Sequence, residues 1–177
     1  MQQQDQDKFF ERDILPHLDA AYNLARWLTH NDHDAEDVVQ EAYLRAFKFY
    51  GGFHGGNGRV WLLKIVRNTC YTWLQQNRKR EVAMDLEEEL PFLESDIPDP
   101  ETVLLHDIDN QLLRRALEEL PVEFREIVIL RELEGLSYKE IADLAGLPLG
   151  TVMSRLARAR KRLAVKLGMS AAPGGLK

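Results

Sequence analysis

SYKEIADLAGLPLGTVMSRLARARKRL, residues 137–163, contains two short helical patterns separated by a turn. Ser137 and Glu140 have the spacing of a capping box, in which a serine hydroxyl and a glutamate carboxylate satisfy free amides at the start of a helix. Gly146 suits the left-handed conformation that ends such a helix. The second helix is expected from Thr151 to about Leu167, and its inner face consists of Val152, Leu156, Ala159 and Leu163.

A short helix, a glycine-containing turn and a second helix with a basic outer face predict a helix-turn-helix, whose second helix enters the major groove of DNA. The side chains predicted to face outward suit phosphates and guanine edges. They are Met153, Ser154, Arg155, Arg158 and Lys161 or Arg162. The alternative is an ordinary helical hairpin with a basic surface.

Every strong periodic signal elsewhere is also helical, so the predicted fold class is all-α. From Asp34, the expected N-cap, apolar residues follow a 3-4 spacing as far as Tyr50. A glycine-rich loop at 51–58 then precedes a helix expected at about Val60–Asn77. The other predicted elements are a helix at about 7–29 that Pro16 kinks or splits, helices at 107–120 and about 122–134, and disordered ends at the N-terminal QQQDQD and at 169–177.

Charge is distributed very unevenly over the 177 residues, whose net charge of −6 taken alone argues against a nucleic-acid binder. Residues 81–110 hold 11 acidic and no basic side chains. Because three prolines also interrupt this stretch, it predicts an acidic linker at 81–106 between a domain at 1–80 and one at 107–168. Within these domains, residues 57–80 and 151–167 each carry six basic side chains and no acidic one.

Other classes of protein are disfavoured by what the sequence lacks. One cysteine, Cys70, excludes an internal disulfide framework, and no signal peptide or membrane span is visible, so a cytoplasmic location without membrane insertion is expected. His30 and His33 lack the i, i+4 spacing of a helical metal pair, so no metal site is expected. No catalytic serine motif, P-loop or dinucleotide fingerprint is present, and neither catalysis nor a cofactor is expected.

Three motifs in order resemble the extracytoplasmic-function sigma factors of the sigma-70 family, two-domain helical initiation factors of bacterial RNA polymerase. DAEDVVQEAYLRAF at 34–47 is similar to the helix that docks on the clamp coiled coil of the polymerase β′ subunit. WLLKIVRNTCYTWL at 61–74, followed by NRKR at 77–80, resembles the helix that recognises and melts the minus-ten element. EIADLAGLPLGTVMSRLARARKRL at 140–163 resembles the reader of the minus-thirty-five element.

The resemblance implies three sets of site residues. Those for core polymerase are Asp34, Asp37, Gln40 and Glu41, and the less favoured alternative is that acids at 34–37 serve only as cap and helix-dipole partners. Those for minus-ten DNA are Phe53, Asn57, Arg59, Lys64, Arg67, Asn68, Tyr71, Arg78, Lys79 and Arg80. Those for minus-thirty-five DNA are Thr151, Met153, Ser154, Arg155, Arg158, Arg160, Lys161 and Arg162.

Some roles within the minus-ten set can be argued from chemistry. Asn68 can hydrogen-bond a base edge, and the glycine loop with Phe53, His54 and Asn57 could form a pocket for a base flipped from the stack. Trp61 could be a stacking platform but is more readily explained as core, which leaves Tyr71 as the better candidate contact. Thr72 stands where many members have an acid, so the identity of the captured base is open.

The resemblance also implies partners. These are core RNA polymerase, through the β′ clamp coiled coil and the β flap, promoter DNA, and an anti-sigma factor that covers the binding faces. The acidic linker is expected either to pass through the polymerase cleft and RNA exit channel or to act as a solvated tether. Two other functions are compatible with the motifs, a stand-alone helix-turn-helix regulator and a decoy that binds an anti-sigma factor without touching DNA.

Overall fold

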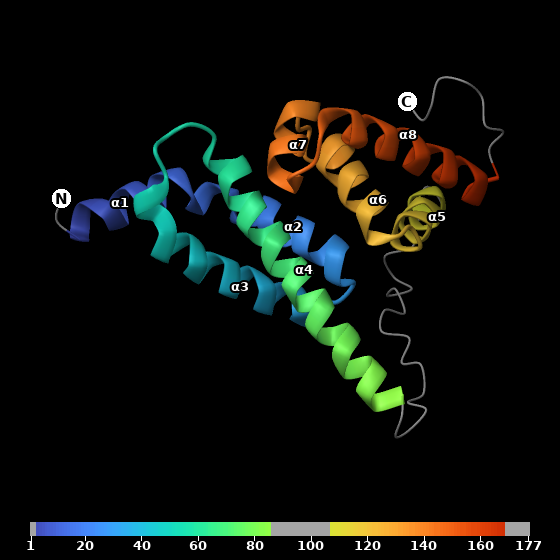
Figure 1. The fold of residues 1–177 in the computed structure, drawn as a ribbon, viewed down its shortest axis with the longest axis horizontal. Helices are drawn as coiled ribbons and strands as arrows, with labels where there is room; N and C mark the ends of the chain where they lie inside the picture. The colour runs from blue at the N-terminus through green and yellow to red at the C-terminus, as the bar shows by residue number, and fades with distance from the viewer. Residues whose placement is uncertain (1–2, 86–106, 169–177) are drawn as a thin grey trace.

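The computed structural model describes residues 3–85 and 107–168, and all regular secondary structure in these ranges is helical (Figure 1). The first group contains α1 (Gln3–Asp13), a 3-10 turn (Leu15–His17), α2 (Leu18–Thr29), α3 (Asp32–Phe49), a second 3-10 turn (Tyr50–Gly52) and α4 (Gly58–Asp85). The second contains α5 (Asp107–Glu118), α6 (Val122–Val128) with a π-helical turn (Ile129–Leu133), α7 (Tyr138–Ala145) and α8 (Leu149–Lys166). The predicted all-α class is confirmed.

In the first group, α2, α3 and α4 pack on one another around a core of buried aliphatic side chains. Pro16 splits the first predicted helix, because it cannot continue the helical hydrogen-bonding pattern. Phe10 holds α1 against this core through edge-on contacts with Tyr43, Phe47 and Tyr50 at 5.2–5.4 Å between ring centroids. Tyr50 in turn donates a hydrogen bond of 2.7 Å to Asp13, which fixes the end of α3 to the end of α1.

Three predicted boundaries in this group are wrong. The N-terminal glutamines are helical from Gln3, although they were expected to be disordered. The N-cap of α3 is Asn31, whose side chain accepts a 3.1 Å hydrogen bond from the amide of Asp34, so Asp34 lies in the first turn and is not the cap. Finally, α4 continues to Asp85, into the stretch predicted as linker. The rest of that stretch and the predicted tail at 169–177 lie outside the described residues.

In the second group, α6 and α8 pack together and α7 crosses α8. Both halves of the predicted capping box are present: Ser137 Oγ accepts from the amide of Glu140 and a Glu140 carboxylate oxygen accepts from the amide of Ser137, each at 3.0 Å. Gly146 ends α7 with φ of +66°. The predicted inner face of α8 is buried in full, which confirms the orientation of the helix.

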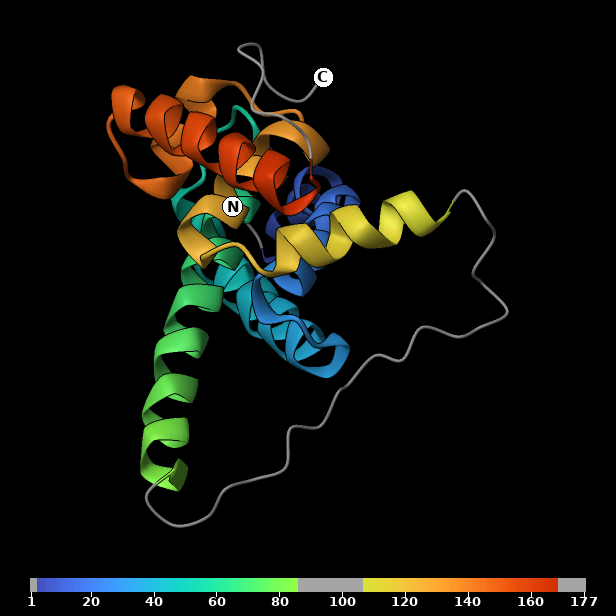
Figure 2. The same ribbon diagram turned by 90° about the vertical axis from the view of Figure 1, so that its right-hand side faces the viewer.

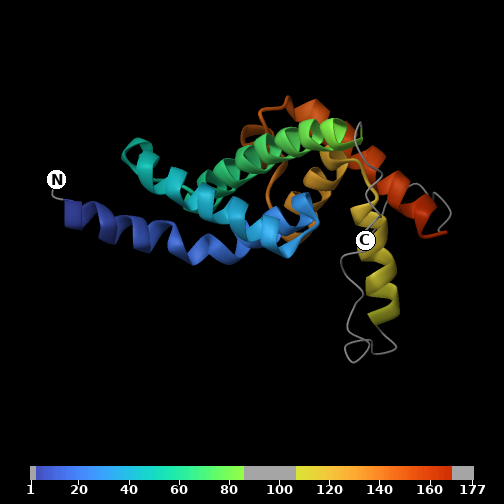
Figure 3. The ribbon, with the colours of Figure 1, turned by 90° about the horizontal axis from the view of Figure 1, so that it is seen from below.

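The two groups lie against each other. α7 packs on the first turns of α4, and α6 packs on α2 (Figure 1). The far end of α4 projects away from the other helices (Figure 2). α1 and α5 lie at opposite ends of the molecule (Figure 3). In the described residues, no helix is long and apolar enough to cross a membrane.

Gly58 fits the start of α4 closely against the end of α1. A Cβ at this position would lie 2.5 Å from the backbone carbonyl oxygen of Asp13, and a backbone atom cannot move aside as a side chain can. We therefore expect Gly58→Ala to lower the free energy of unfolding by about 2 kcal/mol, measured by urea denaturation. Gly52→Ala is the control, because nothing lies within 4 Å of its Cβ, and it should change stability by less than about 0.5 kcal/mol. Equal effects of the two variants would contradict the close fit at Gly58.

Candidate functional site

One face of α4 is open and polar. Lys64, Asn68 and Thr72 are exposed at successive i, i+4 positions, so they form a stripe along the helix. Further along, Arg78, Lys79 and Arg80 are exposed on the part of α4 that projects from the molecule. This surface, called the open face below, combines hydrogen-bonding groups with positive charge, the combination that contacts bases and phosphates.

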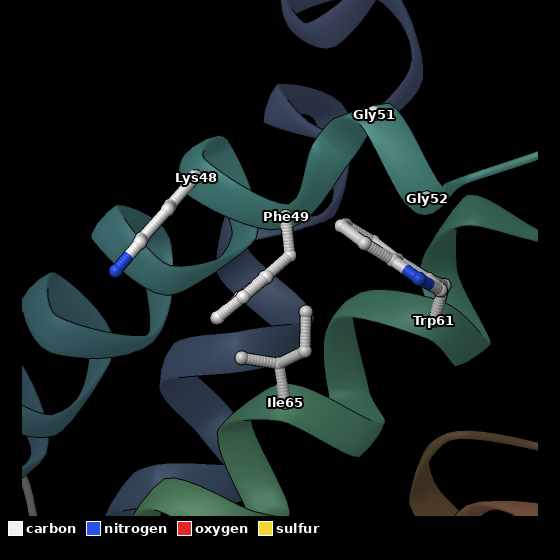
Figure 4. Close-up of a pocket in the computed structure, with 6 residues that line it drawn as sticks. All are labelled: Lys48, Phe49, Gly51, Gly52, Trp61 and Ile65. Carbon is white, nitrogen blue, oxygen red and sulfur yellow. The ribbon is translucent and has the colours of Figure 1, made fainter.

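A hollow of about 500 Å³ lies beside this face, between the end of α3 and the start of α4 (Figure 4). The side chains of Phe49, Trp61 and Ile65 converge on it, and the ammonium group of Lys48 lies 5.6 Å from the centroid of the Phe49 ring. Gly51 and Gly52 complete its wall. Two aromatic rings and a cation suit a planar, electron-rich ring such as a nucleobase.

Trp61 contributes to both the core and this pocket. It is half-buried and packs at 5.2 Å from Phe53 and 6.3 Å from Tyr50, ring centroid to ring centroid, and it also lines the hollow. Phe53 is stacked on Tyr50 at 5.6 Å and supports the tryptophan, whereas the sequence placed Phe53 itself in the binding set. His54, in the same loop, is exposed.

Lys48, Phe49 and Ile65 were missed from the sequence alone. A usable signal existed for Phe49, since this aromatic residue falls off the apolar stripe of its own helix and directly precedes the glycine-rich loop. In the structure the phenylalanine is 58% exposed, so its ring is accessible to a ligand in the hollow.

The other predicted minus-ten residues of α4 lie on a second face, which the second group of helices covers in part, and Asn57, just before the helix, is exposed at the edge of that face. Arg67 and Tyr71 bind the carboxylate of Glu126, Arg59 binds Glu134, and Asn57 binds Glu140. Burial, together with the negative charge of Glu126, raises the pKa of the Tyr71 hydroxyl well above its ordinary value. The predicted set is thus divided between an open face and a covered one.

The four residues predicted to contact polymerase lie on the outer side of α3. Asp37, Gln40 and Glu41 are exposed, and Glu41 accepts a 2.6 Å hydrogen bond from Arg45. Asp34 is only half exposed, and burial together with the charge of Asp37 raises the pKa of its carboxyl group. Asp34 lies in the first turn of α3, near the positive end of the helix dipole, but the effects of burial and of Asp37 on its pKa are larger.

Apolar surface adjoins these polar positions. A groove of about 280 Å³ between α2 and α3 is lined by Leu18, Tyr22, Glu36, Val39, Gln40 and Tyr43. One turn beyond Gln40, Leu44 is 62% exposed, although no sequence pattern singled it out. Leu44 and the neighbouring groove together give this side of α3 an apolar area bordered by charged and amide side chains, which is the composition of a protein-binding patch.

The outer face of α8 is open, but only part of its basic set is free to bind a ligand. Arg160 is paired with Glu132 at 2.5 Å, which braces α8 on the π-helical turn. The guanidinium of Arg162 lies 4.6 Å from the centroid of the Phe124 ring, which braces α8 on α6. Met153, Ser154, Arg158 and Lys161 are exposed, and Thr151 and Arg155 are half-buried. Among the described residues, Arg155 and Arg158 form no side-chain hydrogen bond or ion pair.

No group of three or more metal-ligating side chains occurs among the described residues. His30 is instead the C-cap of α2, with φ of +62°, and its amide bonds the carbonyl of Arg26. Burial and the nearby charges of Arg125 and Arg26 lower the pKa of its imidazole to about 4, so the ring is neutral at pH 7. Cys70 is buried in α4, and burial raises the pKa of its thiol to about 12.

Comparison with known proteins gives matches in both groups of helices. The family model for Sigma-70 region 2 matches residues 14–80, and the model for Sigma-70, region 4 matches residues 110–163. The ECF RNA polymerase sigma factor SigE of Mycolicibacterium smegmatis is 37% identical over 151 residues, which are 85% of this chain and 58% of that protein. The RNA polymerase sigma-H factor of Pseudomonas aeruginosa is 33% identical over 161 residues, covering 87% of this chain and 83% of that one.

A solved structure is similar over nearly the whole chain. The sigma factor RpoE of Bartonella quintana, crystallised with the anti-sigma factor NepR, superposes with a TM-score of 0.75 at 32% identity. The superposition covers 92% of this chain and 99% of that one. The similarity therefore includes both groups of helices.

Proposed function

Because the chain belongs to the extracytoplasmic-function sigma factors of the sigma-70 family, we propose that it binds core RNA polymerase and directs it to specific promoters. The first domain melts the minus-ten element and the second reads the minus-thirty-five element. Residues 86–106 join the two domains. The observation that carries this proposal is the aromatic pocket beside Lys64 and Asn68 on α4, in the same chain as a helix-turn-helix with an open outer face. The protein acts as a non-catalytic partner of the polymerase in the cytoplasm.

At the minus-ten element, the pocket supplies what promoter melting requires. Taking a base out of the stack costs a few kcal/mol, which contacts to the flipped base must offset. Phe49 and Trp61 provide aromatic rings for stacking, and Asn68 presents an amide that can hydrogen-bond a base edge. Arg78, Lys79 and Arg80 on the projecting part of α4 are placed to follow the phosphates of the strand.

At the minus-thirty-five element, α8 is the recognition helix. Its exposed Met153, Ser154 and Arg158 lie on the side away from the core, where the second helix of a helix-turn-helix meets base edges. Arg155 and Arg158 have the geometry for bidentate bonds to guanine or for phosphate contacts. Arg160 and Arg162 are better assigned to bracing the helix than to DNA.

Core polymerase binds α3 in this proposal, through Asp37, Gln40 and Glu41 around the exposed Leu44. The β flap, the second contact that the family resemblance implies, is not assigned to any residue in this proposal. Control by an anti-sigma factor is supported by the similar RpoE, which was crystallised with NepR. Such a factor would cover the faces described above until a signal releases it.

Transcription in vitro tests the proposal directly. Purified protein with core bacterial RNA polymerase should initiate at discrete sites on a library of bacterial promoters, and each component alone should not. A stand-alone regulator would instead bind duplex DNA tightly without polymerase, and a decoy would bind neither DNA nor core. Absence of initiation above the level of core alone would contradict the proposed function.

Replacing Arg158 by alanine should lower promoter-specific initiation by about 10-fold, because a bidentate arginine–guanine contact is worth about 1–3 kcal/mol. Core binding should not change, since Arg158 lies on α8 and the core-binding residues lie on α3. Arg115→Ala, which removes the same charge from an exposed position on α5, is the control. Run-off transcription and a core-binding titration measure the two effects. Equal loss in both assays would assign Arg158 a structural role.

A further inference from the structure

The covered face of α4 is held by three glutamates of the second domain. They are Glu126 on α6, Glu134 after the π-helical turn and Glu140 in the first turn of α7. Glu126 binds Arg67 and Tyr71, Glu134 binds Arg59, and Glu140 binds Asn57. Positive and hydrogen-donating groups of the first domain thus meet carboxylates of the second at every one of these contacts.

The central contact is buried. Glu126 is fully buried, and both of its carboxylate oxygens face the guanidinium of Arg67, whose side chain is 18% exposed. The Tyr71 hydroxyl donates to the same carboxylate at 2.5 Å, and the Arg67 guanidinium lies 4.2 Å from the centroid of the Tyr71 ring. A buried carboxylate lowers stability unless it is paired, and both partners of Glu126 belong to the other domain. The contact can therefore exist only while the two domains are packed together.

Two further contacts lie along the same boundary. Arg59 donates to both the backbone carbonyl and the carboxylate of Glu134, the latter at 2.6 Å. Glu134 directly follows the π-helical turn Ile129–Leu133, and such turns are frequent at functional sites. The side-chain amide nitrogen of Asn57 donates to Glu140 at 3.1 Å, while its side-chain oxygen Oδ1 accepts a hydrogen bond from the amide of Val60.

These carboxylates occupy positions that would suit phosphates. A guanidinium that pairs with a carboxylate through two parallel bonds has the same geometry toward a phosphate group. Arg59 and Arg67 are on the helix that carries Lys64 and Asn68, so a strand captured at the pocket would pass close to them. Glu126 and Glu134 therefore compete with nucleic acid for these guanidinium groups, and Glu140 adds a contact with Asn57 beside them.

The distance between the two promoter elements means that the protein cannot bind both elements and keep the glutamate contacts at the same time. The minus-ten and minus-thirty-five elements are separated by roughly 25 base pairs, or about 85 Å of B-form DNA. A compact chain of this length has a radius of gyration of only about 16 Å. Residues 86–106 could reach about 70 Å when extended, so simultaneous binding of both elements requires the domains to separate. Separation breaks every one of the glutamate contacts.

We propose that Glu126, Glu134 and Glu140 form an intramolecular latch that occupies a phosphate-binding face of α4 and keeps it from DNA until the domains separate. The proposal rests on the assignment of α4 to minus-ten DNA made above. It gives Arg59 and Arg67 two successive partners, a carboxylate in the free protein and the phosphate backbone of the melted strand on the promoter. Polymerase, by holding the domains apart, would expose the covered face of α4.

Two variants that break the same ion pair separate the latch from a merely structural contact. Glu126→Gln removes the carboxylate but keeps Arg67, whereas Arg67→Gln removes the proposed phosphate contact itself. Both should increase the radius of gyration measured by small-angle X-ray scattering. Only Glu126→Gln should bind fluorescein-labelled single-stranded DNA of mixed sequence about 10-fold more tightly than wild type. The salt dependence of that binding should steepen by about 0.7 in log–log slope for each additional phosphate that the variant neutralises.

Glu123→Gln is the matched control, since it removes one exposed carboxylate from the same helix and should change neither quantity. Circular dichroism checks that the variants remain helical, and Glu134→Gln against Arg59→Gln repeats the comparison at a less buried contact. An unchanged radius of gyration for both glutamate variants would overturn the latch. Equal DNA affinities of Glu126→Gln and Arg67→Gln would overturn the phosphate face. Because no polymerase is present, neither result depends on whether the wild type initiates transcription.

Discussion

Replacing Leu44 by aspartate should weaken binding to core RNA polymerase by about 100-fold. Leu44 is 62% exposed on the face of α3 that carries Gln40 and Glu41, so it is available as the apolar anchor of that surface. Removing a central anchor from a protein interface commonly costs about 2–4 kcal/mol, and a buried charge adds to the loss. A titration of fluorescently labelled protein with core enzyme measures the affinity.

The fold should tolerate this change. A substitution at so exposed a position alters stability by about 0.5 kcal/mol or less, so the melting temperature and helical content should stay close to those of wild type. Val165→Asp is the control, because Val165 is 66% exposed at the end of α8 in the other domain. If the two variants bound core equally well, α3 would not be the primary polymerase contact.

Features set by neighbouring residues could be predicted from the sequence. The capping box of Ser137 and Glu140, the left-handed Gly146 and the buried stripe of α8 all depend on contacts within one or two turns of helix. The division at Pro16 is equally local, because proline lacks the amide that a continuous helix requires. The helix-turn-helix was therefore predicted closely, except that α8 begins at Leu149, two residues before the expected Thr151.

Where two residues compete for a local role, the prediction was less successful. Asn31 and Asp34 both suit an N-cap, and the choice of Asn31 lengthens α3 by an extra turn. The N-terminal glutamines have good intrinsic helix propensity, and the packing of Phe10 on three aromatic rings anchors their helix. The sequence of a polar, low-complexity stretch gives no indication that a following aromatic residue will anchor it to the core.

The candidate site was predictable only in part, for a physical reason. Asn68 and Lys64 were identified because their chemistry is visible in one helix. The partner of Arg67 lies 59 residues away, so no helical or turn pattern connects it to Glu126. The pocket likewise joins Phe49 and Trp61 from two helices across the glycine-rich loop. Charge counting located the basic run on α4 but could not reveal which of its members are already paired.

The open face of α4 leads to the second large effect, which concerns Asn68. Its side chain is exposed beside the pocket, and its contact with Arg67 within the described structure is a long 3.4 Å hydrogen bond. Alanine has a higher helix propensity than asparagine, so Asn68→Ala should leave the stability unchanged or slightly increased. Any loss of activity would then report on DNA and not on folding.

Asn68→Ala should reduce promoter opening by about 30-fold, because a lost base-edge contact no longer helps to offset the cost of unstacking. Permanganate reactivity of unpaired thymines, on a promoter selected with wild-type holoenzyme, measures the opening. Asn23→Ala, which removes an exposed amide from α2, is the control and should open the promoter as wild type does.

A template already mismatched across the minus-ten element removes the free-energy cost of melting. On this template the defect of Asn68→Ala should shrink to a few-fold. A defect of equal size on both templates would show that Asn68 acts after melting, and no defect on either would remove it from the site.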